Sequence, residues 1–292
     1  MLQIPEYEEF WFDGCDLKRI AATHWPASGE ARAVVQIAHG MGEHIGRYAQ
    51  TAAYLSSHGF AVLGNDHRGH GRTALASGDI GRFGGAGFDG LVADMARLLE
   101  IGKSRYPALP VILLAHSMGS FAAQQLLLTH SKELAGLALS GSGALDGLLG
   151  ELERLNFDAA KLTNRGFVDP RTTHDWLSRD ENAVDAFLDD PLCFAALAPD
   201  AALSVAQSAP ILADPHRLRL IRSDLPVYFI AGTLDPIGQQ AAGVRVQMSR
   251  YAAAGLQDLQ CDIYEGGRHE MLNETNRAEV LARLLAWIER IL

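Results

Sequence analysis

The residues with the clearest chemical potential surround Ser117, which follows the apolar run 111–115 and His116. A run of this length, rich in branched side chains, predicts a buried strand, and the abrupt change to Ser-Met-Gly before FAAQQLLL predicts a sharp turn into a helix. Such a turn exposes the serine and requires small residues two positions before and after it, here Ala115 and Gly119. We therefore interpret Ser117 as a nucleophile. The alternative is a serine that only caps the following helix.

A carboxylate and an imidazole that could activate this serine come later in the chain. Asp235 follows the apolar run 226–232, and His269 follows the run 259–266. Because the carboxyl ends of parallel strands meet at one edge of a sheet, we expect these groups to converge on Ser117. The imidazole of His269 would take the serine proton, and Asp235 would orient that ring and stabilise its charged form. Considered alone, Asp235 before a proline is more typical of a turn.

A glycine-rich segment, His-Gly-Met-Gly at 39–42, follows another apolar run. Glycines allow the backbone to turn so that a peptide N–H can point at the oxygen that becomes negative during acyl transfer. We expect the backbone N–H groups of Met41 and of Met118, the residue after the nucleophile, to form this oxyanion hole. The alternative is an ordinary turn from a strand into a loop.

Strand-like and helix-like segments alternate along the chain, which predicts an α/β fold with a mostly parallel sheet flanked by helices. An opening hairpin is expected around Asp13-Gly14, because Asp-Gly favours tight turns between antiparallel strands. The expected parallel strands are 34–40, 60–66, 111–117, 136–141, 226–232 and 259–266, and the expected helices are 47–59, 88–104, 120–130, 243–255 and 277–292. The alternation stops between 144 and 215, so we expect a core of 1–143 and 216–292 with a mainly helical cap, 144–215, inserted in it.

The composition excludes several classes of function. The chain has 292 residues, 48% of them hydrophobic, and a net charge of −10 without a basic stripe, which argues against nucleic-acid binding. No apolar run approaches the ~18 residues of a membrane span. No Lys or Arg precedes Lys18, which argues against the positively charged start of a secretory signal. The three cysteines, Cys15, Cys193 and Cys261, are too far apart for a disulfide framework or a metal site. We expect a cytoplasmic protein that needs no cofactor or metal.

Five segments together carry a resemblance to a known family: HGMGEHIGRY, NDHRGHGRT, AHSMG, AGTLDPI and GGRHEMLNE, with DDPLCF in the expected cap. They resemble the α/β-hydrolase superfamily and, within it, the monoacylglycerol lipase and lysophospholipase-like group, which is also labelled serine aminopeptidase-like. The resemblance implies the same triad, Ser117, Asp235 and His269, and the same oxyanion amides, Met41 and Met118. It further implies a buried polar network of Glu43, Arg47 and His116 behind the serine. Residues 66–72 also match a family segment, and their glycines and charges predict a structural loop.

The expected function is therefore hydrolysis of a small-molecule acyl ester through an acyl-enzyme. Between 144 and 215 there are 13 acidic and 5 basic residues, so most of the net charge lies in the cap. A negative cap would repel anionic head groups, and we expect neutral esters of the monoacylglycerol or lysophospholipid type to be preferred. The same charge could simply form a solvated surface. An apolar stripe, Leu145, Leu148, Leu149, Leu152 and Leu155, is expected to pack over the core, with at most peripheral membrane contact through the cap.

Two other functions remain open from the sequence. A related aminopeptidase could use cap carboxylates to hold a substrate ammonium group, and it would cleave amino-acid arylamides in place of acyl esters. A non-catalytic ligand-binding protein with the same fold would have no need for serine, acid and histidine together. The sequence does not indicate the oligomeric state.

Overall fold

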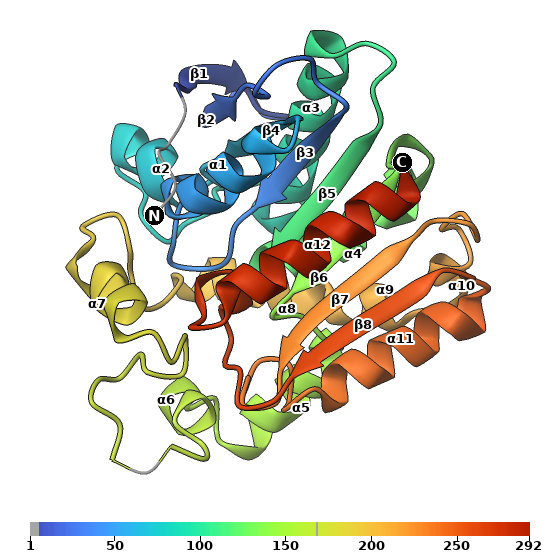
Figure 1. Cartoon of the computed structure of the whole chain (residues 1–292). Coiled ribbons are helices and arrows are strands. Elements are labelled where there is room, and N and C mark those ends of the chain that lie inside the picture. The colour runs from blue at the N-terminus through green and yellow to red at the C-terminus, as the bar shows by residue number, and fades with distance from the viewer. Residues whose placement is uncertain (1–5, 168) are drawn as a thin grey trace.

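The computed structural model describes residues 6–167 and 169–292 and contains an eight-stranded sheet (Figure 1). The strand order is β1-β2-β4-β3-β5-β6-β7-β8. All pairs from β4 onwards are parallel, whereas β1 and β2 run antiparallel to their neighbours. The strands are β1 (Glu8–Asp13), β2 (Arg19–Trp25), β3 (Ala33–Ala38), β4 (Phe60–Asn65), β5 (Val111–His116), β6 (Gly136–Ser140), β7 (Val227–Gly232) and β8 (Leu259–Tyr264). The fold class expected from the sequence is confirmed.

The opening hairpin is present, but its turn is longer than the sequence suggested. Strands β1 and β2 pair from Glu8 opposite His24 to Asp13 opposite Arg19, so residues 14–18 form the connection. Gly14 donates its N–H to the carbonyl of Lys18 at 2.8 Å, and Leu17 adopts a positive φ of 62°. The expectation of a tight Asp-Gly turn was therefore wrong, because Asp13 ends the strand and five residues close the loop.

Two helical layers cover the sheet. Helices α1 (Ala49–Ser57) and α12 (Arg277–Ile291) pack on one face, where Leu55 and Trp287 join a buried apolar cluster with the β-strands. Helices α3 (Gly87–Arg105), α4 (Met118–His130) and α11 (Ala242–Ala254) pack on the other face, where Leu98 and Phe121 belong to a second cluster. The central strands β3 to β7 are buried along their whole length, as both covered faces require.

The region 144–215 contains helices and connecting loops but no strand among its described residues. Its helices are α5 (Leu145–Arg154), α6 (Ala159–Thr163), α7 (Glu181–Asp189), α8 (Pro199–Gln207), α9 (Ala209–Ala213) and α10 (Pro215–Leu218), the last of which ends just beyond it. In Figure 1, α6 and α7 lie beyond the arrowheads of the central strands, while α8 and α9 pack against α3 and α4. The leucine stripe of α5 faces the core, with Leu145 and Leu148 buried and Leu149, Leu152 and Leu155 partly buried.

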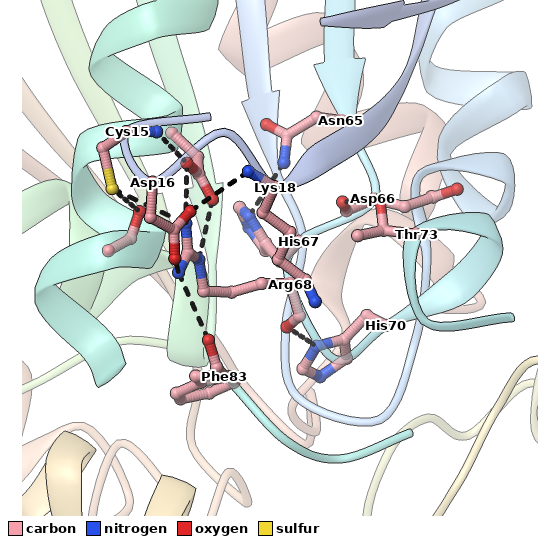
Figure 2. A network of polar contacts seen from close by, with 12 residues as sticks. Cys15, Asp16, Lys18, Asn65, Asp66, His67, Arg68, His70, Thr73 and Phe83 are labelled. Carbon is pink, nitrogen blue, oxygen red and sulfur yellow. Dashed lines mark hydrogen bonds and ion pairs between the residues drawn. The ribbon is translucent and has the colours of Figure 1, made fainter. Parts of the chain in front are cut away.

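The segment 66–72, expected to be a structural loop, leads into a short helix, α2 (Gly71–Ser77), that the sequence analysis did not predict. It also carries Arg68, whose side chain is completely buried. Figure 2 shows Arg68 directed at Asp16 and at the carbonyl of Phe83. Its guanidinium also donates two hydrogen bonds to Asp94 of α3, at 2.8 and 2.9 Å. This cluster joins the opening hairpin to the helical layer.

Candidate active site

Ser117 lies at the turn between β5 and α4, with φ 51° and ψ −122°. A positive φ is strained for serine, and it points the side chain away from both elements. A Cβ on Gly119 would lie 2.4 Å from the carbonyl oxygen of His39, which explains why a glycine is needed two residues after Ser117. Ala115, two residues before it, is fully buried without strain in the strand. The local geometry is that of a nucleophile elbow.

His269 and Asp235 are bonded directly to each other. The Nδ1 of His269 lies 2.8 Å from Oδ1 of Asp235, and the same oxygen accepts the N–H of Ile237 at 2.9 Å. Both side chains are almost completely buried. Burial alone would lower the pKa of His269, but the charge of Asp235 and its hydrogen bond outweigh burial and raise that pKa. Asp235 therefore stabilises the charged imidazole, as an orienting acid should.

The histidine lies beside the elbow. The ring of His269 is 4.6 Å from the ring of His116, the residue before Ser117. Gly141 shows how tight the junction is, because a Cβ there would lie 2.8 Å from Cε1 of both rings. In the described part of the chain the Ser117 hydroxyl has no hydrogen bond to His269, a situation that is common before substrate binds. The structure thus places the bonded His269–Asp235 pair against His116, the residue that precedes Ser117.

The expected oxyanion groups flank the serine. Met118 is the first residue of α4, so its N–H has no partner within the helix and is available at the elbow. Met41 belongs to the loop after β3, and its neighbour Gly40 touches the elbow: a Cβ on Gly40 would lie 3.0 Å from Cβ of Ser117. The side chain of Met41 is 40% exposed, so it can contact only the rim of the site, whereas Met118 is buried.

Glu43 and Arg47 form an ion pair beneath this loop, at 2.7 Å. Glu43 also accepts the N–H of Gly40 at 2.6 Å and the hydroxyl of Tyr48 at 2.7 Å. Burial alone would raise the pKa of Glu43, but the charge of Arg47 outweighs burial and holds that pKa well below its usual range. The charged carboxylate therefore fixes the backbone at Gly40, directly before Met41.

Sequence reasoning missed Glu270, the second carboxylate bound to Arg47. The two side chains are paired through two hydrogen bonds of 2.7 and 2.8 Å. Glu270 follows His269 directly, so Arg47 links the loop after β3, through Glu43, to the loop that carries His269. The available signal was that a buried arginine next to one glutamate has capacity for a second carboxylate. Nothing local identified Glu270 as that partner.

His116, the third expected member of this network, interacts with Glu43 through its charge and not through a hydrogen bond. Among the described residues it makes no hydrogen bond to Glu43 or Arg47, and its contact is with the ring of His269. Burial, and then the positive charge of His269, lower the pKa of His116 to about 4. His116 is therefore neutral near pH 7, and its ring is close to both Glu43 and His269.

One group of three potential metal ligands occurs in the described residues: His44, Asp190 and Cys193. His44 Nδ1 accepts the N–H of Gly46 at 3.2 Å, so its proton lies on Nε2, which donates to Asp190 at 2.8 Å. This tautomer leaves no lone pair on Nε2 for a metal. The contact is a hydrogen bond between the loop after β3 and the region 144–215, next to a second one from the N–H of Phe194 to the carbonyl of Gly42 at 2.9 Å.

Known proteins resemble this chain along most of its length. A family model described as serine aminopeptidase, S33, matches residues 29–276. Over 285 residues, or 96% of each chain, the protein is 30% identical to a monoacylglycerol lipase from Mycolicibacterium smegmatis. It is 28% identical to a monoglyceride lipase from Mus musculus, over 91% of this chain and 85% of the mouse protein. A thermostable carboxyl esterase from Bacillus coagulans, solved with glycerol, matches with a TM-score of 0.87, 30% identity and 98% coverage of both chains.

Proposed function

The chain belongs to the serine aminopeptidase S33 family of α/β-hydrolases and, within it, to the carboxylic-ester hydrolases of the monoacylglycerol lipase group; we propose that it hydrolyses neutral acyl esters through an acyl-enzyme on Ser117. The observation that carries this proposal is the buried His269–Asp235 pair beside a serine at a strained strand-to-helix turn. We expect monoacylglycerol-type esters to be hydrolysed fastest, and anionic esters of the lysophospholipid type to be hydrolysed more slowly.

The reaction proceeds in two halves. His269 Nε2 takes the proton of the Ser117 hydroxyl as its oxygen attacks the ester carbonyl, and Asp235 stabilises the imidazolium through Nδ1. The N–H groups of Met41 and Met118 bind the negative oxygen of the tetrahedral intermediate. The intermediate collapses, and the alcohol leaves with the proton from His269. Water, deprotonated by the same ring, then attacks the acyl-enzyme and releases the acid and free Ser117.

Four further residues would hold this machinery in place: Glu43, Arg47, His116 and Glu270. Arg47 is bonded to Glu43 and to Glu270, so it ties the loop of one oxyanion amide to the loop of the general base. A fixed distance between these loops matters because a shift of about 1 Å can cost roughly 10²-fold in rate. His116 places an uncharged ring against His269. Because burial lowers the pKa of His116, this ring does not compete with His269 for the proton of Ser117.

The substrate preference rests on the region 144–215, which we propose acts as a cap over the site. Part of its negative charge is neutralised by basic side chains of the core, as in the pairs Asp146–Arg250 and Asp180–Arg277. The excess of acidic residues remains and disfavours an anionic head group. The Bacillus coagulans esterase was solved with glycerol, the neutral alcohol that a monoacylglycerol would release. None of the described helices is long and apolar enough to cross a bilayer. The proposal includes a cytoplasmic location and at most peripheral contact with a membrane.

The proposal is tested with a panel of esters that vary in chain length and head group. We expect the protein to react with a fluorophosphonate probe and to turn over monoacylglycerols, and we expect Ser117→Ala to abolish both, with a loss of up to ~10⁶-fold in kcat. Neutral esters should react faster than anionic lysolipids at low salt, and the difference should shrink as salt screens the cap. Turnover of amino-acid arylamides without ester turnover would favour an aminopeptidase, and no probe labelling would favour a non-catalytic protein.

A further inference from the structure

The ring of His269 contacts a second aromatic side chain, which comes from the cap. The indole of Trp176 lies 5.0 Å from the imidazole of His269, centroid to centroid, with an angle of 37° between the planes. Trp176 belongs to the loop between α6 and α7, and its side chain is only half-buried. None of the motifs that identified the site contains this residue, so its position next to the general base is a product of the tertiary structure.

The cap is bonded to the backbone on each side of this contact. The N–H of His269 donates to the carbonyl of Trp176 at 3.3 Å, and the N–H of Glu270 donates to the carbonyl of Leu177 at 2.7 Å. The guanidinium of Arg268 also donates to the carbonyl of Ser178 at 2.9 Å. Two backbone hydrogen bonds and one from the Arg268 side chain therefore hold residues 176–178 against residues 268–270. This pairing leaves Trp176 little freedom to move relative to His269.

From this geometry we propose that Trp176 is a positioning residue for the acid–base step, which holds the His269 ring and stabilises its charged form from the cap. This inference rests on the proposed function, since it needs His269 to be the general base. An aromatic face attracts a cation within about 6 Å of its centre, and tryptophan does so most strongly. His269 becomes a cation each time it takes the proton of Ser117 or of the attacking water.

The other groups that face His269 do not replace this effect. Asp235 from the loop after β7, Glu270 on the same loop as His269, and Glu43 from the loop after β3 are anionic and favour the imidazolium from the core side. His116 from β5 faces the ring and is neutral near pH 7, so it adds no favourable charge. Trp176 is the contribution of the cap, and it would couple the seating of the cap to the basicity of His269.

The test compares Trp176→Leu with Trp176→Phe, which keeps an aromatic ring and so remains informative if the leucine variant folds poorly. Trp11→Leu is the matched control, because Trp11 is a half-exposed tryptophan on the edge strand β1. For each protein, kcat and KM on a neutral p-nitrophenyl ester and the rate of fluorophosphonate labelling are measured separately from pH 5 to 9. Circular dichroism and Tm establish that each variant is folded.

Loss of the indole should lower the apparent pKa of the acid limb by about half a unit and reduce the plateau of kcat by about two- to fivefold. Trp176→Phe should fall between wild type and Trp176→Leu, and Trp11→Leu should match wild type. The inference is overturned if folded Trp176→Leu and Trp176→Phe keep the wild-type pH profile in both assays and change only KM. If the wild-type protein neither turns over esters nor reacts with the probe, the proposed function itself fails, which is a separate result.

Discussion

Two buried arginines of this protein have similar partners and different surroundings. The Arg47 cluster, Glu43, Arg47 and Glu270, lies beside the candidate active site, and the Arg68 cluster, Asp16, Arg68 and Asp94, lies under the opening hairpin (Figure 2). Each guanidinium is held between two carboxylates. In the Arg47 cluster all three side chains are nearly buried, whereas Asp16 in the Arg68 cluster is 41% exposed.

The electrostatics of the two clusters also differ. Arg47 holds the pKa of Glu43 low in spite of burial, whereas burial raises the pKa of Asp94 in spite of Arg68. The segments that they join differ as well, because Arg47 bridges the loop after β3 to the loop that carries His269, and Arg68 bridges a hairpin to α3. The same ion-pair chemistry therefore joins two loops of the candidate active site in one place and joins two elements of the fold in the other.

The largest expected effect belongs to Arg68. Arg68→Met leaves the completely buried carboxylate of Asp94 without a counter-charge, which should lower the free energy of unfolding by about 3–5 kcal/mol. Urea denaturation measures this loss, and kcat/KM per probe-labelled site should stay at the wild-type value. The control is Arg19→Met, which breaks an exposed pair with Asp13 and should cost no more than about 1 kcal/mol. A loss of activity per site with unchanged stability would show that the two clusters do not differ as described.

The Arg47 cluster should respond in activity as well as in stability, because Arg47→Met also leaves the buried carboxylates of Glu43 and Glu270 without a counter-charge. Arg47→Met releases both catalytic loops, so kcat/KM should fall by about 10²-fold below the temperature at which the variant unfolds, and the fall should be in kcat more than in KM. Arg47→Lys should retain only part of the activity. The ammonium group keeps the positive charge, but it cannot pair with Glu270 through two parallel hydrogen bonds. Arg277→Met, which removes an ion pair between core and cap, is the control. Full activity in folded Arg47→Met would contradict the positioning role.

The smallest effect is a difference in acid sensitivity. Glu43 has a lowered pKa, so the stability it provides is complete above its unfolded value of 4.5 and is lost as the pH falls below it. Asp94 has a raised pKa, so its protonation favours the folded state, and this group contributes nothing to loss of stability in acid. Unfolding free energies measured at pH 6.5 and 3.5 should therefore differ less for Glu43→Gln than for wild type. Asp94→Asn should not reduce that difference. A reduction would mean that the pKa of Asp94 is lowered, not raised, in the folded protein.

The strands, the helices and the elbow were predictable because short-range rules determine them. The apolar run 111–115, the small residues around Ser117 and the periodic helices carry their own signals, and the structure places these elements where the sequence expected them. The hairpin turn and α2 were not predicted correctly. Residues 14–18 close through a bond from Gly14 to Lys18, and α2 begins where Asp66 accepts the N–H of Arg72, and neither contact has a distinctive composition.

By itself the sequence determined which residue types could do chemistry, in what order they occur, and that each follows a strand. Only the tertiary structure decided which of them meet. Asp235 and His269 are bonded across 34 positions, and Arg47 and Glu270 across 223. Local propensity and periodicity act over a few residues, so they contain no record of such pairs. The contacts of Glu270 and Trp176 arise because the packed sheet and the region 144–215 bring distant loops to one edge of the sheet. A buried charge such as that of Glu270 is costly there unless it is paired.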